Sequence, residues 1–152
     1  MATYDFTKGA GAVDHRSFGK MFREKINIKV SEIIASNATL TTNAKITAAD
    51  VIQLWDIPAD VVILPGGCLE TVTPGTAANT ADIGIAGGDE MFDGVALDAT
   101  AGTLQVNLVG DDWGVNSVTA VSFTATDTLD MVFVADEIVG EWNLYVIGYV
   151  ID

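Results

Sequence analysis

The sequence has almost none of the side chains on which nucleophilic and zinc chemistry depend. Its 152 residues include one cysteine, Cys68, and one histidine, His15. A single thiol cannot form an intrachain disulfide, and two such ligands are too few for the usual zinc sites. His15 lies in a segment without clear periodicity, whereas a catalytic base needs a rigid element. We therefore predict that the protein is not an enzyme and has no cofactor, and we interpret Cys68 as a buried, inert thiol.

Basic residues are missing from the last two thirds of the chain. All seven Lys and Arg lie in the first 45 residues, where four acidic residues oppose them and leave a net charge of +3. The remainder holds 17 acidic residues and no basic one, and the whole chain carries −14. A body this acidic repels nucleic acid and anionic lipid, so we expect neither nucleic acid nor membrane as a partner. The basic segment suits an acidic protein surface, or it is only a solvated tail.

Long apolar runs are also missing. No stretch approaches the roughly 20 apolar residues that span a bilayer, and the N-terminus shows no apolar core of a secretory signal. Yet 49% of the residues are hydrophobic and the mean hydropathy is +0.37, enough for one domain with a core. We divide the chain into a basic N-terminal arm, residues 1–22, and a β domain, residues 23–152.

The chain does contain short stretches in which apolar and polar residues alternate with the period of two that is typical of strands. The expected strands are Ile26–Ser31, Ala48–Ile57, Val61–Thr73 with a bulge at Pro65-Gly66-Gly67, Thr80–Ala86, Leu104–Val109, Val121–Ala125, Leu129–Phe133 and Trp142–Ile151. Strands at this spacing predict an all-β fold of about 7–9 strands. We expect an antiparallel β-sandwich, a jelly roll or a barrel, with the arm extended.

Between these strands we expect a helical turn at Lys20–Lys25, a loop at Ala38–Lys45 and a long surface loop at Gly87–Thr103, but no long helix. Trp142–Ile151 is apolar on both faces, which predicts a strand that is central in a sheet or lies in a subunit interface. Lysine is missing from the β domain after Lys45. Lysine on an edge strand commonly prevents pairing with strands of other molecules, so we expect the strand edges of this domain to be paired or covered in an assembly.

Acidic and aromatic residues supply two further candidates. Asp82, Asp89, Glu90, Asp93 and Asp98 gather in or near a Gly-rich loop, a setting that Ca²⁺ can use. The EF-hand spacing is absent, and Asp and Gly favour loops without any ligand, so we predict no metal site and leave calcium open. Trp55, Trp113 and Trp142 could stack on sugars, although such residues are more often core or interface anchors.

A resemblance to a known family covers roughly residues 46–110. A strand ends in a proline turn at Asp50–Ala59, a Thr- and Ala-rich turn follows, and then come Asp82-Ile83-Gly84-Ile85 and Phe92-Asp93-Gly94. This order resembles the capsid decoration, or cement, proteins of tailed phages. The resemblance implies a structural protein made in the host cytoplasm and placed on the outer surface of the virion capsid. It also implies binding to the major capsid protein and self-association, often as a homotrimer, but it identifies no binding residue.

The sequence thus predicts a capsid decoration protein. The alternative is a phage-associated carbohydrate-binding β module for tail or surface adhesion, with Trp113 or Trp142 as its platform. Cations of the N-terminal region and aromatic residues of the apolar last strand are the predicted partner-binding residues. They are Lys8, Arg16, Lys20, Arg23, Lys25, Trp142, Tyr145 and Tyr149.

Overall fold

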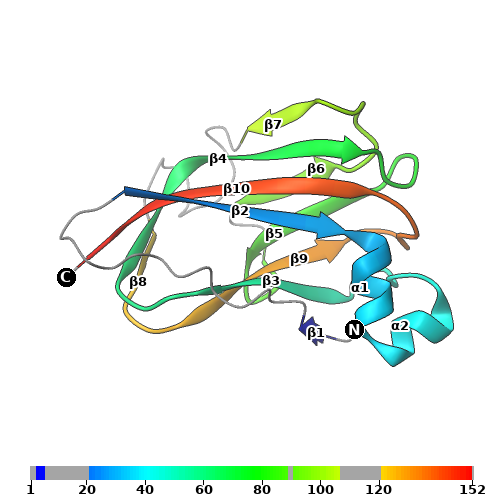
Figure 1. The fold of residues 1–152 in the computed structure, drawn as a ribbon, viewed down its shortest axis with the longest axis horizontal. Coiled ribbons are helices and arrows are strands. Elements are labelled where there is room, and N and C mark those ends of the chain that lie inside the picture. The colour runs from blue at the N-terminus through cyan, green and yellow to red at the C-terminus, as the bar shows by residue number, and fades with distance from the viewer. Residues whose placement is uncertain (1–2, 6–20, 89–90, 107–120, 152) are drawn as a thin grey trace.

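Two β-sheets face each other across one hydrophobic core (Figure 1). The computed structural model describes residues 3–5, 21–88, 91–106 and 121–151, which form ten strands and two short helices. In chain order these are β1 (Thr3–Asp5), β2 (Met21–Lys29), α1 (Val30–Ser36), α2 (Ala38–Asn43), β3 (Val51–Ile57), β4 (Val61–Thr73), β5 (Thr80–Ile85), β6 (Phe92–Ala96), β7 (Leu104–Val106), β8 (Val121–Phe123), β9 (Asp127–Phe133) and β10 (Glu141–Val150). The all-β, sandwich-like prediction is confirmed.

Sheet A has the strand order β1-β3-β9-β5-β6, and sheet B has the order β2-β10-β4-β7, with β8 also paired to β4. All pairs are antiparallel except β1 with β3. β10 lies in the middle of sheet B, between β2 and β4, as its two apolar faces allow. The pairing of β4 with β10 shifts register near Gly66 and Gly67, so the predicted bulge is also confirmed.

The core is built from the inward half of each alternating strand. Ile26 and Ile28 of β2 and Leu144 and Val146 of β10 are buried, whereas their neighbours in sequence are partly exposed or polar. Trp142 is fully buried, and its indole nitrogen donates a hydrogen bond to the Leu97 carbonyl at 3.2 Å. A polar indole group therefore lies in the core without the cost of an unpaired donor.

Three local predictions are wrong. Lys20–Lys25 is not a helical turn, because β2 starts at Met21 and pairs with β10 along its whole length. Residues 30–43 form α1 and α2 instead of a strand end and a loop. Leu40 is buried there, and the Asn37 side chain caps α2 by accepting a hydrogen bond from the Thr39 amide at 2.9 Å. Burial of a few apolar residues thus outweighs the turn preference of Thr and Asn.

The predicted loop Gly87–Thr103 also contains a strand, β6, which pairs with β5 at the edge of sheet A. Its residues Phe92 and Val95 are buried in the core. The two residues Asp93-Gly94 separate them and hide the alternation from a sequence pattern.

The N-terminal region enters the sandwich at two places. Thr3–Asp5 pairs with β3 in sheet A, and Tyr4 packs against the core. Met21 and Phe22 begin β2 in sheet B. Lys8, Arg16 and Lys20 lie outside the described residues. In the described part of the chain, no helix is long and apolar enough to cross a membrane.

Candidate protein-binding surface

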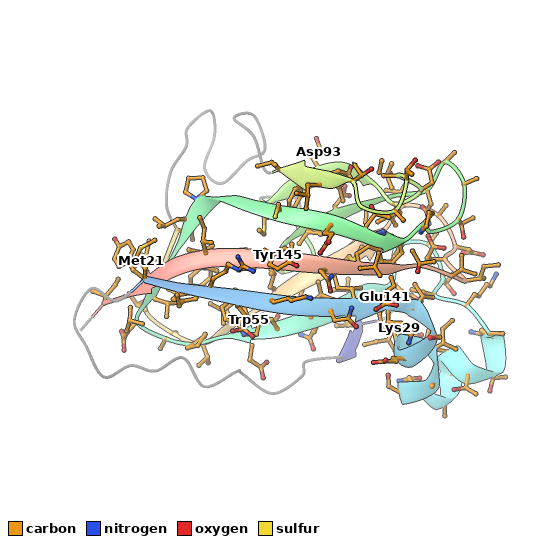
Figure 2. The ribbon with its side chains drawn as sticks, turned by 45° about the horizontal axis from the view of Figure 1, so that its top comes forward. Met21, Lys29, Trp55, Asp93, Glu141 and Tyr145 are labelled. Atoms are coloured by element: carbon orange, nitrogen blue, oxygen red, sulfur yellow. The ribbon has the colours of Figure 1, made fainter. Side chains whose placement is uncertain are left out.

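The outward side of sheet B, which we call the outer face, carries a fixed order of side chains. Strand alternation turns every second residue of β2, β10 and β4 away from the core, and strand pairing aligns these residues in rows. One row is Asn27, Asn143, Glu70 and Leu104, and the next is Lys25, Tyr145, Cys68 and Val106. Figure 2 shows Tyr145 near the middle of this face, on β10 between β2 and β4. Charged, amide and apolar groups therefore lie side by side on one surface.

The structure brings together on the outer face the predicted residues Arg23, Lys25, Tyr145 and Tyr149. Trp142 lies on the other side of β10, where it has no exposed surface and belongs to the core. It does not offer a platform for a sugar. The remaining predicted binding residues, Lys8, Arg16 and Lys20, and the other candidate platform, Trp113, lie outside the described residues.

Tyr145 is the centre of the outer face. The Arg23 guanidinium lies 4.7 Å from the centroid of its phenol ring, and the Lys25 ammonium lies 5.8 Å from it. Both distances are within the range of cation–π attraction. The Tyr145 hydroxyl donates a hydrogen bond of 2.8 Å to the Glu70 carboxylate. Two cations and one anion are thus held around a single aromatic side chain.

A chain of hydrogen bonds continues from Glu70 across the sheet. The Asn143 amide donates to Glu70 at 2.9 Å, and the Asn27 amide donates both to Asn143 at 3.1 Å and to Glu141 at 3.0 Å. These bonds join β2, β10 and β4 through their side chains. A partner would therefore meet polar groups that are already positioned, and it would lose little side-chain entropy in them.

The contact of Glu70 with Tyr145 changes how both groups titrate. Hydrogen bonds from Asn143 and Tyr145 lower the pKa of Glu70, and the hydrogen bond to Glu70 raises the pKa of Tyr145. The bonded carboxylate therefore stabilises the fold at pH values above its unfolded pKa, and this contribution is lost as the pH falls through its lowered folded pKa.

We expect Tyr145 to ionise at a higher pH than an ordinary tyrosine, and Glu70→Gln to bring its pKa down toward the usual value. The substitution removes the negative acceptor that favours the protonated phenol. The measurement is a tyrosinate absorbance titration in a Tyr4→Phe/Tyr149→Phe background, with circular dichroism to check folding at each pH. A titration curve that Glu70→Gln leaves unchanged would show that the two groups do not interact in solution.

A depression of about 430 Å³ opens on the outer face between β10 and β7. It is lined by Arg23, Gly66, Cys68, Glu70, Leu104, Tyr145 and Ile147. Cys68 is only partly buried, so the prediction of a buried thiol is wrong. Partial burial raises the pKa of this thiol, Arg23 acts in the opposite sense, and Glu70 raises it further. The raised pKa keeps the thiol protonated at neutral pH and therefore a poor nucleophile. The depression therefore combines apolar, aromatic and charged side chains in one shallow surface feature.

The turn between β9 and β10 has an unusual distribution of polarity. Glu137 is fully buried, whereas the next two residues, Ile138 and Val139, are 56% and 48% exposed. We call Ile138 and Val139 the apolar tip. The Glu137 carboxylate accepts hydrogen bonds from Asn79 at 2.9 Å, from the Thr76 amide at 2.9 Å and from the Thr76 hydroxyl. The turn lies between two expected strands, Leu129–Phe133 and Trp142–Ile151, but no sequence pattern indicates that the acid is inside and the aliphatic residues outside.

The Glu137 carboxylate also fixes the apolar tip directly. It accepts hydrogen bonds from the backbone amides of Ile138 at 3.1 Å and Val139 at 3.4 Å. Glu137 is in addition bridged to Ile46 by two backbone hydrogen bonds of 2.9 Å. The tip is therefore an exposed apolar surface on a rigid support.

The acidic residues near the Gly-rich loop bind backbone groups. Asp82 accepts a hydrogen bond from the Gly94 amide at 2.8 Å, and Asp98 accepts one from the Ala78 amide at 2.8 Å. These bonds are ordinary turn chemistry. Among the residues that the structure describes, no group of three or more His, Cys, Asp or Glu is placed to hold a metal ion. Asp89 and Glu90 are not among them.

No family model matches the chain, and no curated protein matches it either. Among solved structures, this chain aligns with a chain of the capsid of Ralstonia phage GP4. The alignment covers 99% of this chain and 99% of that capsid chain, with a TM-score of 0.63 and 14% identity. The fold is similar to that of a phage capsid chain. At this identity the likeness is one of fold, and it extends over the whole sandwich.

Two more phage structures align over 90% of the chain, each with a TM-score of 0.48. One is the acidic stable capsid structure of Helicobacter pylori bacteriophage KHP30, at 14% identity and 92% of that chain, and the other is the cyanophage Pam1 capsid asymmetric unit, at 15% identity and 89% of that chain.

Proposed function

We propose that this chain is a structural protein of a phage virion. More specifically, we propose a capsid decoration protein that binds the outer surface of the shell formed by the major capsid protein and stabilises it. The observation that carries this proposal is the outer face, where exposed Leu104 and Val106 adjoin a hydrogen-bonded array of charged and amide groups. Such a surface is suited to a protein partner. The full-length likeness in fold to a chain of the GP4 capsid supports the same class.

Two parts of the molecule would have separate roles in this function. The β domain would associate with copies of itself, as a homotrimer, and the basic arm would attach to an acidic surface of the shell. Three arms on one trimer would bind together more tightly than one alone, because the later contacts form within one complex. A decoration protein needs such multiple attachment, since it must join several shell subunits to stabilise them.

The chemistry of the described surface agrees with a structural role. Arg23 and Lys25 are stacked on Tyr145, and Lys45 is paired with Asp136. These cations are not arranged as a phosphate clamp, in keeping with a partner other than nucleic acid. The carbohydrate-binding alternative would have to rely on Trp113, because Trp142 is buried.

The test is binding to shells assembled from the major capsid protein of the same phage. Purified protein should co-sediment with shells to saturation, appear as added density on their outer surface in electron microscopy, and raise the temperature at which they break. Shells that bind none of the protein, or bind it only on the inner surface, would exclude a decoration role. Synthesis in the host cytoplasm would be seen as protein recovered in the soluble host fraction before lysis.

A further inference from the structure

We propose that copies of this chain associate head to tail, with the apolar tip of one copy seated in the outer-face depression of the next. The tip is Ile138 and Val139, and the depression is the space lined by Leu104, Ile147 and Cys68 with Arg23 and Glu70 at its margin. The inference rests on the proposed function, because it assigns the contact that would build the trimer. It can nevertheless be tested on the purified protein without any shell.

The turn between β9 and β10 has the reverse of the usual polarity. A surface turn normally exposes its charged residue and buries its aliphatic ones, because hydration of a carboxylate and burial of a hydrocarbon are both favourable. This turn buries Glu137 and exposes Ile138 and Val139. Five donors satisfy the buried carboxylate, so the arrangement is stable in the single chain. Burial of this exposed apolar surface by a partner would be favourable.

This chain itself offers a surface that the tip could occupy. The depression has a volume of about 430 Å³, and its lining includes apolar Ile147 on the β10 side and apolar Leu104 on the β7 side. Leu104 is 59% exposed and Val106, beside it on β7, is 45% exposed. An Ile–Val pair from a second copy would cover these residues and would itself be covered. Both contacting surfaces would then lose exposed hydrocarbon in one step.

Both signs of charge border the tip and the depression. Lys29 of β2 and Glu141 of β10 lie beside the tip and next to each other at one end of the outer face (Figure 2), and Lys29 is also paired with Glu32 at 3.7 Å. Arg23 and Glu70 are among the residues that line the depression. In the proposed contact, Glu141 lies toward Arg23 of the next copy and Lys29 toward its Glu70, so that opposite charges meet.

The tip and the depression are different parts of the surface, so the contact is heterologous. Repeating a heterologous contact forms a closed ring when the rotation between copies allows it. With three copies, every tip and every depression is filled, and no exposed contact remains to drive further growth. This geometry accounts for self-association in a strongly acidic body, because the docked charges are balanced locally.

The test is the native mass of the purified protein and of the double variant Ile138→Asp/Val139→Asp. We expect the full chain to be a trimer at micromolar concentration and the variant to be a folded monomer. The control is Val134→Asp, which also replaces an exposed aliphatic residue by aspartate, at a residue that is 58% exposed and next to sheet A instead of sheet B. The control should remain a trimer. A monomeric full chain, or a trimer that the tip variant leaves intact, would overturn the inference.

A charge-swap pair keeps the test decisive if the tip variant does not fold. Arg23→Glu should weaken association by about tenfold or more, since it places two anions together. Adding Glu141→Arg should restore most of the lost affinity by reversing the pair. If Arg23→Glu and Glu141→Arg each weaken self-association and the double variant does not restore it, the proposed orientation is wrong.

Alkylation of Cys68 gives an independent readout. The thiol lines the depression, so a seated tip would shield it and its reaction rate would fall as the protein concentration rises. A rate that does not depend on concentration would contradict the inference even if a trimer exists. Shell binding is measured separately. A trimer that shows the expected effects of the variants and of Cys68 alkylation, but does not bind shells, would support the inference and contradict the proposed function.

Discussion

Replacing Glu137 by alanine is expected to lower the free energy of unfolding by at least about 3 kcal/mol, because buried donors lose their acceptor at about 1–3 kcal/mol each. The donors are the amides of Thr76, Ile138 and Val139, the Thr76 hydroxyl and the Asn79 side chain. For a chain of this size the melting temperature should fall by about 6–12 °C. Urea denaturation followed by circular dichroism gives the free energy directly.

Two controls separate the buried hydrogen bonds from the loss of a negative charge. Asp136→Ala removes the neighbouring acid, which is partly exposed, pairs with Lys45 and accepts a hydrogen bond from the Ala48 amide, and it should cost about 1 kcal/mol or less. Glu137→Gln keeps the shape of the side chain and one acceptor oxygen, so its effect should fall between the other two. A Glu137→Ala protein as stable as Asp136→Ala would mean that the carboxylate is not buried in solution.

Reversing the first three cations of the sequence, as Lys8→Glu/Arg16→Glu/Lys20→Glu, is expected to lower the affinity for capsid shells by about tenfold or more. This prediction rests on the proposed function and on the concentration of basic residues in the first 45 positions. Charge reversal is preferable to deletion of residues 1–22, because Tyr4 and Phe22 pack against the core and a deletion would remove both. Co-sedimentation with shells measures the affinity, and the melting temperature should stay unchanged.

The matched control, Lys8→Arg/Lys20→Arg, keeps the charges and should bind shells as the unmodified protein does. Binding of the unmodified protein should weaken as salt is added, whereas the residual binding of the charge-reversed variant should respond much less. Equal shell affinity in the reversed variant and in the unmodified protein would reduce the basic segment to a solvated tail. In that case attachment would have to come from the β domain.

The sequence predicts this fold well where one strand has one buried face. Ile26 and Ile28, and Trp142 with Leu144, follow the alternation that sends them into the core. The sequence pattern does not predict the secondary structure where a few long-range contacts determine it. α2 forms because Leu40 finds a place in the core, and β6 forms because β5 is available to pair with it. Neither neighbour is visible in a local window of sequence.

The candidate surface was predictable in part. The alternating last strand correctly separated Tyr145 and Tyr149 from the core side, while Trp142 proved to be on the buried side of the same strand. The role of Glu70 could not be predicted, because the hydrogen bond from Tyr145 joins residues 75 positions apart. The exposure of Ile138 and Val139 likewise depends on Thr76 and Asn79, which approach Glu137 only in the folded chain.

The central position of β10 has a consequence for the order of folding. This strand is the last of the described ones, yet it joins β2 to β4 and supplies Trp142, Leu144 and Val146 to the core. Its partners in β2 precede it by more than one hundred residues, as in the pair of Asn27 with Asn143. Sheet B therefore cannot close before β10 has been synthesised, and the long-range pairing of its strands favours slow folding. The outer face, and any association through it, would then exist only on chains translated through β10.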